Sequence, residues 1–600
     1  MASWDIDGGD YRLRSLELSS RLRNDQPDLV LQRLNYPKPF SVKTLCAAIQ
    51  KHCSVSAVKT YLSSYAHADD FKRTMASTGW PALYYAVERN SAELVAILLR
   101  YQVDPHWSSK TFPIPVIVFA IIHGHREALD TTDVVRTFLA CGVDPKAIAM
   151  DMWEVYLDTP KPTLSTRSGP STRSQLGSGS EYSWCTEGVR RMLAEAFHLT
   201  HRYHFHRAHR MKEPTMRIRQ IAEGNKMSDL LKLPFFLVGQ RSATKMVQTK
   251  VYPYIAGKRN GPLVMAFDGP SGHGKTELAR IMGDLLSVKT QVIDCGKIRD
   301  QWGILGPTTG WRGHEKGSQL NNFLAENSGL RSVVFLDEFD KTDEKVMHAL
   351  LVVIEKGEYE DRRHNTAVDC SKTIWIIATN VGAEQIVAYY TEHLSHLSED
   401  EIAEANLADL QKQLGSIYQN EFGAPFTGRV GSIIPFLPFS KPEVAVVGHK
   451  FILRLASRFR EPISLQPGID RYAAHCRMTV LEDGMVCAEL AQEFYNQHAG
   501  ARSIENAVVW VEEQAIEQYG LLEMPIDEKL NEGPLQEIVV QRIPAGNDEY
   551  EIKVIARIPE EKSTARGGNA VPVMDDMHST NGQTSEKKKE NKGKNKAGDE

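Results

Sequence analysis

Apolar residues in the middle of the chain occur in short, almost unbroken runs that alternate with amphipathic stretches. Runs of this kind lie at 263–267, within 332–341 and within 372–380. A strand that is covered on both faces has such a continuous run, whereas helices place apolar residues at every third or fourth position. The first run is followed by a helical series, which consists of Leu278, Ile281, Met282, Leu285 and Leu286. This order predicts an α/β fold built on a doubly wound parallel sheet.

The N-terminal region contains two similar units, at 79–105 and 114–145, which align through Ala86 and Ala120 and both end in Val-Asp-Pro. A more degenerate copy lies at 44–62. The spacing of 34 residues and the helical pattern resemble ankyrin repeats, and a plain helical domain is the alternative. We expect this α-helical ankyrin-like region to span 40–159 and to bind protein partners.

Residues 160–184 are rich in Ser, Thr, Gly and Pro and are expected to form a flexible linker. A basic helical connector is expected at 185–234, and it contains a cluster of five histidines at 198–209. The interleaved arginines and aromatic residues leave no defined geometry for a metal. We therefore favour an exposed basic helix over a metal site.

Two alternating segments near the C-terminus, at 535–543 and 550–558, predict a β-hairpin within 526–559. The residues after it, 560–600, form a Lys-rich tail with almost no apolar side chains. Such a tail cannot bury enough surface to fold, so we expect disorder.

Composition excludes several classes of protein. The 71 basic and 76 acidic residues give a net charge of -5, which disfavours nucleic-acid binding as the main function. No apolar run reaches the roughly 18 residues of a membrane span. The N-terminal segment 1–39 begins with acidic residues and lacks the features of a targeting signal, so a cytoplasmic location is expected, with nuclear or mitochondrial locations left open.

The segment 262–286 holds the clearest chemical motif. Gly269, Gly274, Lys275 and Thr276 have the G-x-x-x-x-G-K-[ST] spacing of a phosphate-binding loop. The motif lies between the first predicted strand and the helical series, which is the context that such a loop requires. We therefore expect ATP binding, with Lys275 on the β- and γ-phosphates and Thr276 on Mg²⁺.

Polar side chains end the two later strands. Asp337 and Glu338 follow one run, and Asn380 follows the other. Asp337 is expected to complete the Mg²⁺ shell with Thr276, Glu338 to deprotonate the attacking water, and Asn380 to position that water. The carboxyl ends of parallel strands share one sheet edge, so these groups should converge on one γ-phosphate.

A tryptophan on a glycine-rich loop needs a separate explanation. Trp311 and Arg312 lie between Gly310 and Gly313, where no helix or strand period would bury the indole. An exposed aromatic residue on a loop that glycines allow to move is suited to contacting another molecule. The alternative is that Trp311 packs on its own domain.

These motifs resemble, in order and spacing, an AAA+ module of the Clp type. The segments "LVGQRSA" (237–243), "GPSGHGKTELAR", "GWRGHEKGSQL", "FLDEFDK" and "IATNVG" are similar to that family's adenine-side, phosphate-loop, pore-loop, Walker B and sensor 1 motifs. The resemblance implies a large ATPase subdomain at 235–440 and a small helical lid at 441–525. It also implies a nucleotide site, made of Val238, Gly269, Pro270, Ser271, Gly272, His273, Gly274, Lys275, Thr276 and Glu277.

Two arginines complete the resemblance. "FTGRVGSIIPF" (426–436) is similar to the arginine-finger segment, which implies that Arg429 meets the γ-phosphate of a neighbouring subunit. "HAGARSIENAVVWVEEQ" (498–514) is similar to the sensor 2 segment, which implies that Arg502 meets the nucleotide of its own subunit. The same resemblance makes the loop around Trp311 a pore loop that grips polypeptide.

A single phosphate loop behind ankyrin-like repeats resembles the mitochondrial ClpB-type disaggregases. This implies an ATP-driven unfoldase or disaggregase that acts on unfolded or aggregated polypeptides as a homo-oligomeric ring of six, a hexamer. Partner-peptidase docking is disfavoured because no Ile-Gly-Phe or Ile-Gly-Leu triplet follows sensor 1. The alternatives are an ATP-switched ankyrin scaffold that threads nothing and, less favoured, a nucleic-acid remodeller.

Overall fold

A computed structural model describes residues 27–32, 41–65, 81–106, 114–163, 182, 184–257, 261–546 and 549–558 of the chain. The expectations for the first 26 residues, for most of the linker and for the Lys-rich tail lie outside these residues. In the part of the chain that is described, no helix is long and apolar enough to span a membrane.

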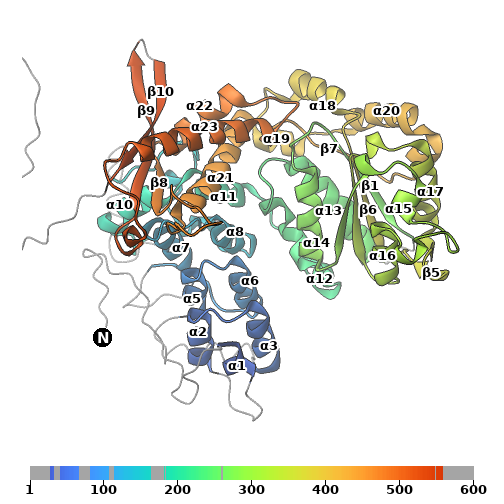
Figure 1. The fold of residues 1–600 in the computed structure, drawn as a ribbon, viewed down its shortest axis with the longest axis horizontal. Helices are drawn as coiled ribbons and strands as arrows, with labels where there is room; N and C mark the ends of the chain where they lie inside the picture. Colours follow the sequence, from blue (N-terminus) through green and yellow to red (C-terminus); the bar gives the residue numbers. More distant parts are fainter. Residues whose placement is uncertain are drawn as a thin grey trace, which may run out of the picture. The chain divides into compact units, whose positions relative to one another are not determined.

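The N-terminal region is made of short helices that pack in pairs (Figure 1). They are α1 Pro27–Gln32, α2 Val42–Gln50, α3 Val55–Tyr65, α5 Ala82–Glu88, α6 Ala92–Arg100, α7 Val116–Arg126 and α8 Thr132–Ala140, followed by η2 Pro145–Ala147 and η3 Met150–Met152. Ser41 and Ser91 cap α2 and α6 by accepting hydrogen bonds from backbone N–H groups three residues on. This pairing agrees with a helical repeat region, and its assignment to the ankyrin family stays a prediction.

The connector is also helical but, contrary to expectation, is not exposed. It comprises α10 Glu187–Ala196, α11 Leu199–Arg210, α12 Met216–Gly224 and η4 Ser228–Phe235. On α11 the side chains of His201, Arg202, His204 and Arg207 are buried. The prediction of an exposed basic helix was wrong because α8 and the lid helix α21 Lys441–Arg460 both pack against α11.

The ATPase region is a parallel five-stranded sheet in the order β2-β3-β6-β1-β7. Its strands are β1 Leu263–Asp268, β2 Thr290–Asp294, β3 Ser332–Asp337, β6 Thr373–Thr379 and β7 Ile433–Pro435. A two-stranded antiparallel hairpin, made of β4 Glu358–Asp361 and β5 Thr366–Asp369, lies between β3 and β6 in sequence. The doubly wound parallel sheet is therefore confirmed.

Helices cover both faces of this sheet, as Figure 1 shows. They are α13 Arg241–Ala256, α14 Lys275–Leu286, α15 Gln301–Leu305, α16 Gln319–Glu326, α17 Glu344–Lys356, α18 Ala383–Tyr389, α19 Glu399–Glu404 and α20 Ala408–Thr427, with short turns η5 Cys295–Lys297, η6 His314–Lys316, η7 Phe339–Lys341 and the π turn η8 Tyr390–Leu394. Successive strand residues join different cores. Phe335 packs with the α13 and α14 side and Leu336 with the α16 and α17 side, which explains the continuous apolar runs.

The lid consists of α21 Lys441–Arg460, α22 Asp483–Phe494 and α23 Ala501–Gly520 together with a small sheet. That sheet has the order β10-β9-β8, with β8 Cys476–Val480 parallel to β9 Gln536–Gly546, and β9 antiparallel to β10 Glu549–Arg557. The short turn η9 Glu528–Glu532 precedes β9. The C-terminal hairpin is thus joined to the lid by β8.

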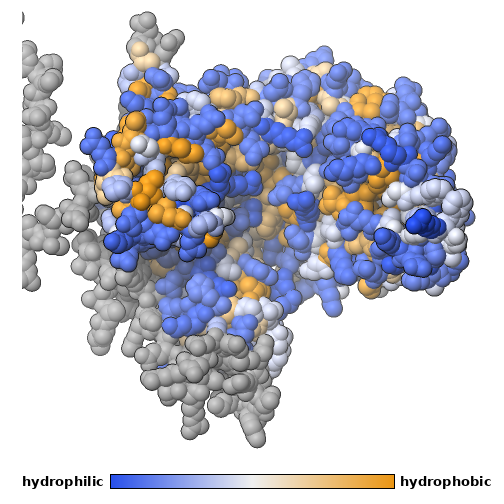
Figure 2. All heavy atoms as spheres, in the orientation of Figure 1, coloured by the Kyte–Doolittle hydropathy of each residue, from blue (hydrophilic) through white to orange (hydrophobic). Residues whose placement is uncertain are grey.

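Hydrophobic side chains are exposed on the lid. Figure 2 shows hydrophobic residues gathered over the segment around β8, which is drawn orange to red in Figure 1. The exposed large apolar side chains of this part of the chain include Leu465, Ile469, Tyr472 and Leu481.

Candidate nucleotide site and pore loop

The phosphate loop connects β1 to α14 through three glycines that have positive φ. The φ values are +144° at Gly269, +73° at Gly272 and +89° at Gly274. A Cβ atom on Gly269 would lie 2.6 Å from the carbonyl oxygen of Phe436, and one on Gly272 would lie 2.2 Å from that of Ala499. Backbone conformation and close packing both require glycine at these two positions.

Lys275 is buried at the start of α14. Its Nζ donates to the carbonyl oxygens of Gly269 and Pro270, at 2.5 and 3.0 Å, and to Oδ1 of Asn380 at 2.8 Å. Burial lowers the pKa of Lys275 to about 8, and the nearby carboxylates of Asp268 and Asp337 oppose that shift. The ammonium therefore lies against the loop that it is expected to serve, and Asn380 lies beside it.

The expected metal ligands are also together. The hydroxyl of Thr276 donates to Oδ2 of Asp337 across 3.1 Å, from α14 to the end of β3. A hydroxyl and a carboxylate oxygen are ligands that Mg²⁺ prefers, and nucleotide phosphates and water supply the rest of such a shell. Thr276 and Asp337 therefore fit a magnesium ion held jointly with a nucleotide.

Glu338 follows Asp337 in the left-handed backbone conformation, with φ of +51°. Its carboxylate pairs with the ammonium of Lys341 at 3.0 Å and is partly exposed. A glutamate in this position reaches solvent at the sheet edge and can contact a water molecule there. A left-handed backbone is uncommon for a residue other than glycine and is found at functional sites.

A buried aspartate that the sequence motifs did not single out supports the Asn380 turn. Asp268 ends β1 and accepts hydrogen bonds from the N–H of Gly382 at 3.1 Å and from the hydroxyl of Thr379 at 3.3 Å. Burial raises the pKa of Asp268 to about 6. Because β1 and β6 are paired neighbours, Asp268 fixes the turn that carries Asn380.

The lid contacts the phosphate loop directly. Arg502, at the start of α23, donates to the hydroxyl of Ser271 at 2.9 Å, and the N–H of Ala501 donates to the carbonyl of Gly272 at 3.0 Å. The ring of His273 stacks on that of Phe439, with 4.9 Å between the ring centroids. Burial lowers the pKa of His273 to about 4, so this ring is neutral.

The connector contacts the segment 237–243, which is expected to lie on the adenine side of the nucleotide. Val238 is buried and packs in the same core as Phe439 and the lid helices. Arg207 of α11 donates to the carbonyl of Leu237 at 2.6 Å, and the N–H of Gly239 donates to the hydroxyl of Tyr203 at 3.1 Å. No sequence pattern indicated that α11 would position this segment.

Two expected site residues lie apart from this cluster. Glu277 is exposed on the first turn of α14. Arg429 follows α20, where its guanidinium pairs with Glu355 at 2.7 Å and also donates to the carbonyl of Pro425. The structure therefore does not bring Arg429 to the phosphate loop of its own chain.

The loop around Trp311 is exposed. The Trp311 side chain is 60% exposed, and the flanking Gly310 and Gly313 have φ of +94° and +88° with open space around both. Trp311 contacts one other indole, that of Trp302, which is itself 43% exposed, with 5.2 Å between ring centroids. Arg312 is exposed as well. The sequence did not point to Trp302, because its contact with Trp311 depends on the course of the loop between them and not on a helix or strand period.

Neighbouring elements anchor the base of this loop. The Thr309 hydroxyl donates to the carbonyl of Arg362 at 2.8 Å, and the Arg362 guanidinium donates to the carbonyl of Gly306 at 2.8 Å. Arg362 belongs to the turn between β4 and β5. The loop therefore has a fixed base and an exposed tip.

Comparisons with known proteins agree with this geometry. A family model described as AAA domain (Cdc48 subfamily) matches residues 262–433, which hold the phosphate loop and the strand ends. These residues form an AAA domain of the P-loop class. The relatives of the chain include ClpB chaperones and the mitochondrial disaggregases.

The individual matches are distant. The chaperone protein ClpB of Chlamydia caviae is 26% identical over 251 residues, which are 41% of this chain and 26% of that protein. The mitochondrial disaggregase of Homo sapiens is 29% identical over 302 residues, 45% of this chain and 40% of that protein. The chain thus spans 40% or less of the length of either relative. A solved complex of Saccharomyces cerevisiae Hsp104 with casein, in an extended conformation, is 22% identical, with a TM-score of 0.40, over 54% of this chain and 52% of that one.

Proposed function

We propose that the protein hydrolyses ATP and uses the energy to pull polypeptides through a ring of its own subunits. The observation that carries the enzymatic part is the meeting of Lys275, Asn380 and the Thr276–Asp337 pair at one edge of the sheet, beneath the lid residue Arg502. If Lys275 only closed a glycine-rich turn, the site would need neither the Thr276–Asp337 pair nor Arg502 from the lid.

Each side chain has a defined task in this proposal. Lys275 holds the β- and γ-phosphates, and Thr276 and Asp337 hold Mg²⁺, which supplies charge neutralisation at the phosphates when it is bound. Asn380 orients the attacking water once Lys275 has left Asn380 for the phosphates. Glu338 leaves Lys341, accepts the proton of that water and so activates it for attack.

The arginines connect the site to the rest of the assembly. Arg502 reaches the nucleotide from the lid of the same chain, so the lid position depends on what the site holds. Arg429 lies apart from its own phosphate loop, which suits a contact with the nucleotide of a neighbour. We propose a homo-oligomeric ring, a hexamer, and the apolar side chains exposed on the lid support such a contact between subunits.

Trp311 is the proposed grip on the polypeptide. An indole contacts many kinds of side chain without reading a sequence, and Trp311 lies on a glycine-hinged loop with a fixed base. Arg312 beside it adds a positive charge, so acidic segments should be gripped more firmly. The names of the relatives, chaperone and disaggregase, support unfolded or aggregated polypeptides as substrates.

Hydrolysis is tested with purified full chain and the variant Glu338→Gln, by measuring phosphate release and the binding of a fluorescent ATP analogue. The account predicts that the variant binds the nucleotide as tightly as the original protein and hydrolyses it at least about a hundredfold more slowly. Glu344→Gln, an exposed carboxylate at the start of α17, is the matched control and should keep full activity. Equal hydrolysis by Glu338→Gln would contradict the role of Glu338.

A switched scaffold is the second candidate, and it is favoured by the ankyrin-like region. In that case ATP would control assembly of a surface that binds proteins, and Trp311 would have no part in work on substrates. The two functions make opposite predictions for a Trp311→Ala variant that still hydrolyses ATP. Threading requires the indole, so the variant should lose threading, whereas the switched scaffold should be unaffected.

A further inference from the structure

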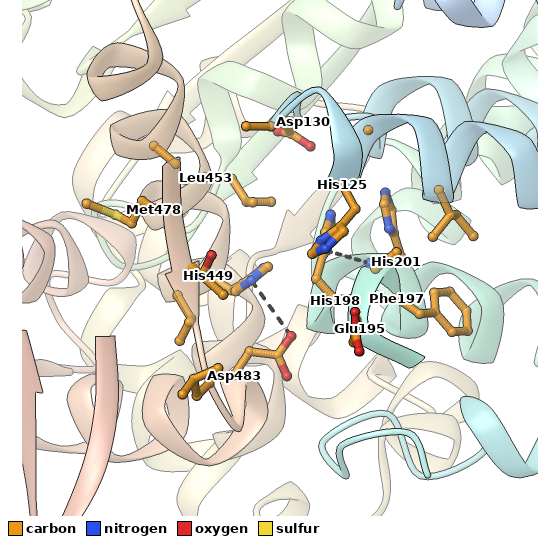
Figure 3. A pocket seen from close by; sticks show the side chains of 18 of the residues that line it. His125, Asp130, Glu195, Phe197, His198, His201, His449, Leu453, Met478 and Asp483 are labelled. Carbon is orange, nitrogen blue, oxygen red and sulfur yellow. Dashed lines mark hydrogen bonds and ion pairs between the residues drawn. The ribbon is translucent and has the colours of Figure 1, made fainter. Parts of the chain in front are cut away.

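A cavity of about 700 Å³ lies between the helical repeats, the connector and the lid. Its walls come from the turn between α7 and α8, from the junction of α10 and α11, and from α21, β8 and the start of α22 (Figure 3). This volume is in the range of sites that enclose small organic molecules. None of the expected nucleotide-site residues lines the cavity.

The inner wall is largely apolar. Ile121, Leu129, Ile452, Leu453, Met478 and Val480 contribute aliphatic and thioether groups to it. Figure 3 shows Leu453 and Met478 on the lid side of this space, opposite His125 and His198. A wall of this kind favours a ligand that is itself mostly apolar.

The deepest ionic groups neutralise one another. Asp483 accepts hydrogen bonds from the two terminal nitrogens of Arg202, at 2.6 and 3.3 Å, and from the N–H of Leu199 at 2.5 Å. Both side chains are buried. Of the other charged residues on the wall, Glu195, Arg191 and Glu482 are exposed at the rim, whereas Asp130 and Arg477 are half-buried and opposite in charge. Because the wall carries charges of both signs, no cluster of one sign selects an ionic ligand inside.

Histidines supply the polar part of the wall. The rings of His198 and His201 are stacked with 3.6 Å between centroids, and His449 lies 5.0 Å from His198. His449 shares a hydrogen bond of 2.7 Å with the hydroxyl of Thr200. Burial lowers the pKa of His198 and of His449 to about 3, so these rings are neutral at physiological pH.

Two buried ring nitrogens lack a hydrogen-bond partner among the described residues, Nε2 of His198 and Nδ1 of His201. His201 is fully enclosed, and burial holds its pKa well below the usual value. Both nitrogens are enclosed by protein atoms and lie behind the cavity wall. Among the residues that the structure covers, no group of His, Cys, Asp and Glu could hold a metal ion, so a metal is not the occupant that we infer.

We propose that this cavity binds an uncharged organic molecule of drug-like size that is mostly apolar. Such a ligand contacts α21 and α22, and both helices pack against α23, which carries Arg502. Occupancy therefore stabilises the contact between the repeats and the lid.

The test uses the full chain and a neutral fluorescent probe, 6-propionyl-2-(dimethylamino)naphthalene, which has an apolar ring system and one carbonyl acceptor. We expect saturable binding at one site, with emission shifted to shorter wavelength. Leu453→Trp and Ala456→Phe fill the cavity from α21 and should each remove this binding, whereas Leu465→Trp, on an exposed loop of the lid, should keep it.

Charge selectivity and stabilisation provide the second measurement. Excess 1-naphthalenesulfonate, a similar ring with a fixed negative charge, should fail to displace the probe. The probe should raise the unfolding temperature of the original protein but not that of Leu453→Trp. The proposal would be overturned if the probe showed no saturable binding or if the sulfonate displaced it. Binding to Leu453→Trp and Ala456→Phe as tight as to the original protein would overturn it as well.

Discussion

The ammonium nitrogen of Lys275 lies 2.8 Å from the side-chain oxygen of Asn380, so two residues that are expected to serve the same phosphate are hydrogen-bonded to each other. The bond joins the first turn of α14 to the end of β6 across adjacent strands. The three N–H donors of Lys275 are used by Gly269, Pro270 and Asn380, so an anion that binds the ammonium must displace one of these acceptors, and in the proposed function that acceptor is Asn380. In the proposed function this exchange frees Asn380 to hold the attacking water only after a phosphate is bound.

This relationship predicts that nucleotide binding takes up protons near pH 8. Burial lowers the pKa of Lys275 to about 8, and phosphate anions beside the ammonium favour its charged form and raise that pKa. At pH 8 about half a proton should enter per bound nucleotide through this group. Calorimetric titration in two buffers of different ionisation enthalpy measures the uptake.

Lys275→Arg is the matched control for proton uptake, because a guanidinium stays charged in both states. Its titration at pH 8 should lack the Lys275 contribution, whatever its affinity. Equal proton uptake by the original protein and by Lys275→Arg would show that Lys275 is already fully charged before binding.

Arg429 predicts hydrolysis that depends on assembly. In the structure its guanidinium pairs with Glu355 of the same chain, 2.7 Å away. If Arg429 serves the neighbouring site, the activity per subunit should rise with protein concentration, and Arg429→Ala should remove that rise. An arginine contributed in trans is worth about a thousandfold in rate or more. Phosphate release, measured across a dilution series beside light scattering, separates activity from assembly.

Glu355→Gln completes the Arg429 experiment. It releases the arginine from its partner without removing it, so activity should be kept or raised. An Arg429→Ala protein that assembles and hydrolyses ATP at the original rate would rule out the finger role.

The buried histidines predict a loss of stability in acid. The pKa of His198 and of His449 is about 3 in the folded chain and near 6.5 when unfolded, so the unfolded state binds more protons between these values. Stability is therefore complete above pH 6.5 and falls as the pH drops towards 3, by about 1.4 kcal/mol per pH unit for each ring. Urea unfolding at pH 7.5, 6.5 and 5.5 measures the slope.

His198→Phe keeps an aromatic ring on His201 and removes one titrating group. The difference in unfolding free energy between the original protein and this variant should shrink or reverse on acidification, in favour of the variant. Groups with raised pKa values, such as Asp268 near 6, cancel in that difference. Parallel pH profiles for the two proteins would contradict the assignment.

The sequence predicted those parts of the fold that local pattern determines. Continuous apolar runs identified β1, β3 and β6, and Asp337, Glu338 and Asn380 follow the carboxyl ends of the neighbouring parallel strands β3 and β6. The phosphate loop required glycine where the structure has positive φ. These features depend on residues that are close in sequence or on strand order.

The missed features depend on contacts between distant segments. The histidine-rich helix α11 has the composition of a solvated surface, yet Arg202 meets Asp483 and His198 lies near His449, both more than 240 positions along the chain. Trp302 was missed for a similar reason, since only the loop geometry places it against Trp311. No periodicity within α11 or α15 could reveal which element would cover them.

The most direct test of the threading account is ATP-driven unfolding of green fluorescent protein that carries an unstructured tail, followed as loss of fluorescence. Trp311→Ala should hydrolyse ATP as the original protein does and unfold this substrate at least about tenfold more slowly, whereas Trp311→Tyr, which keeps an aromatic ring, should retain most of the unfolding. Unfolding by Trp311→Ala at the original rate would contradict the grip. Failure of the original protein to unfold the substrate, despite full hydrolysis, would favour the switched scaffold instead.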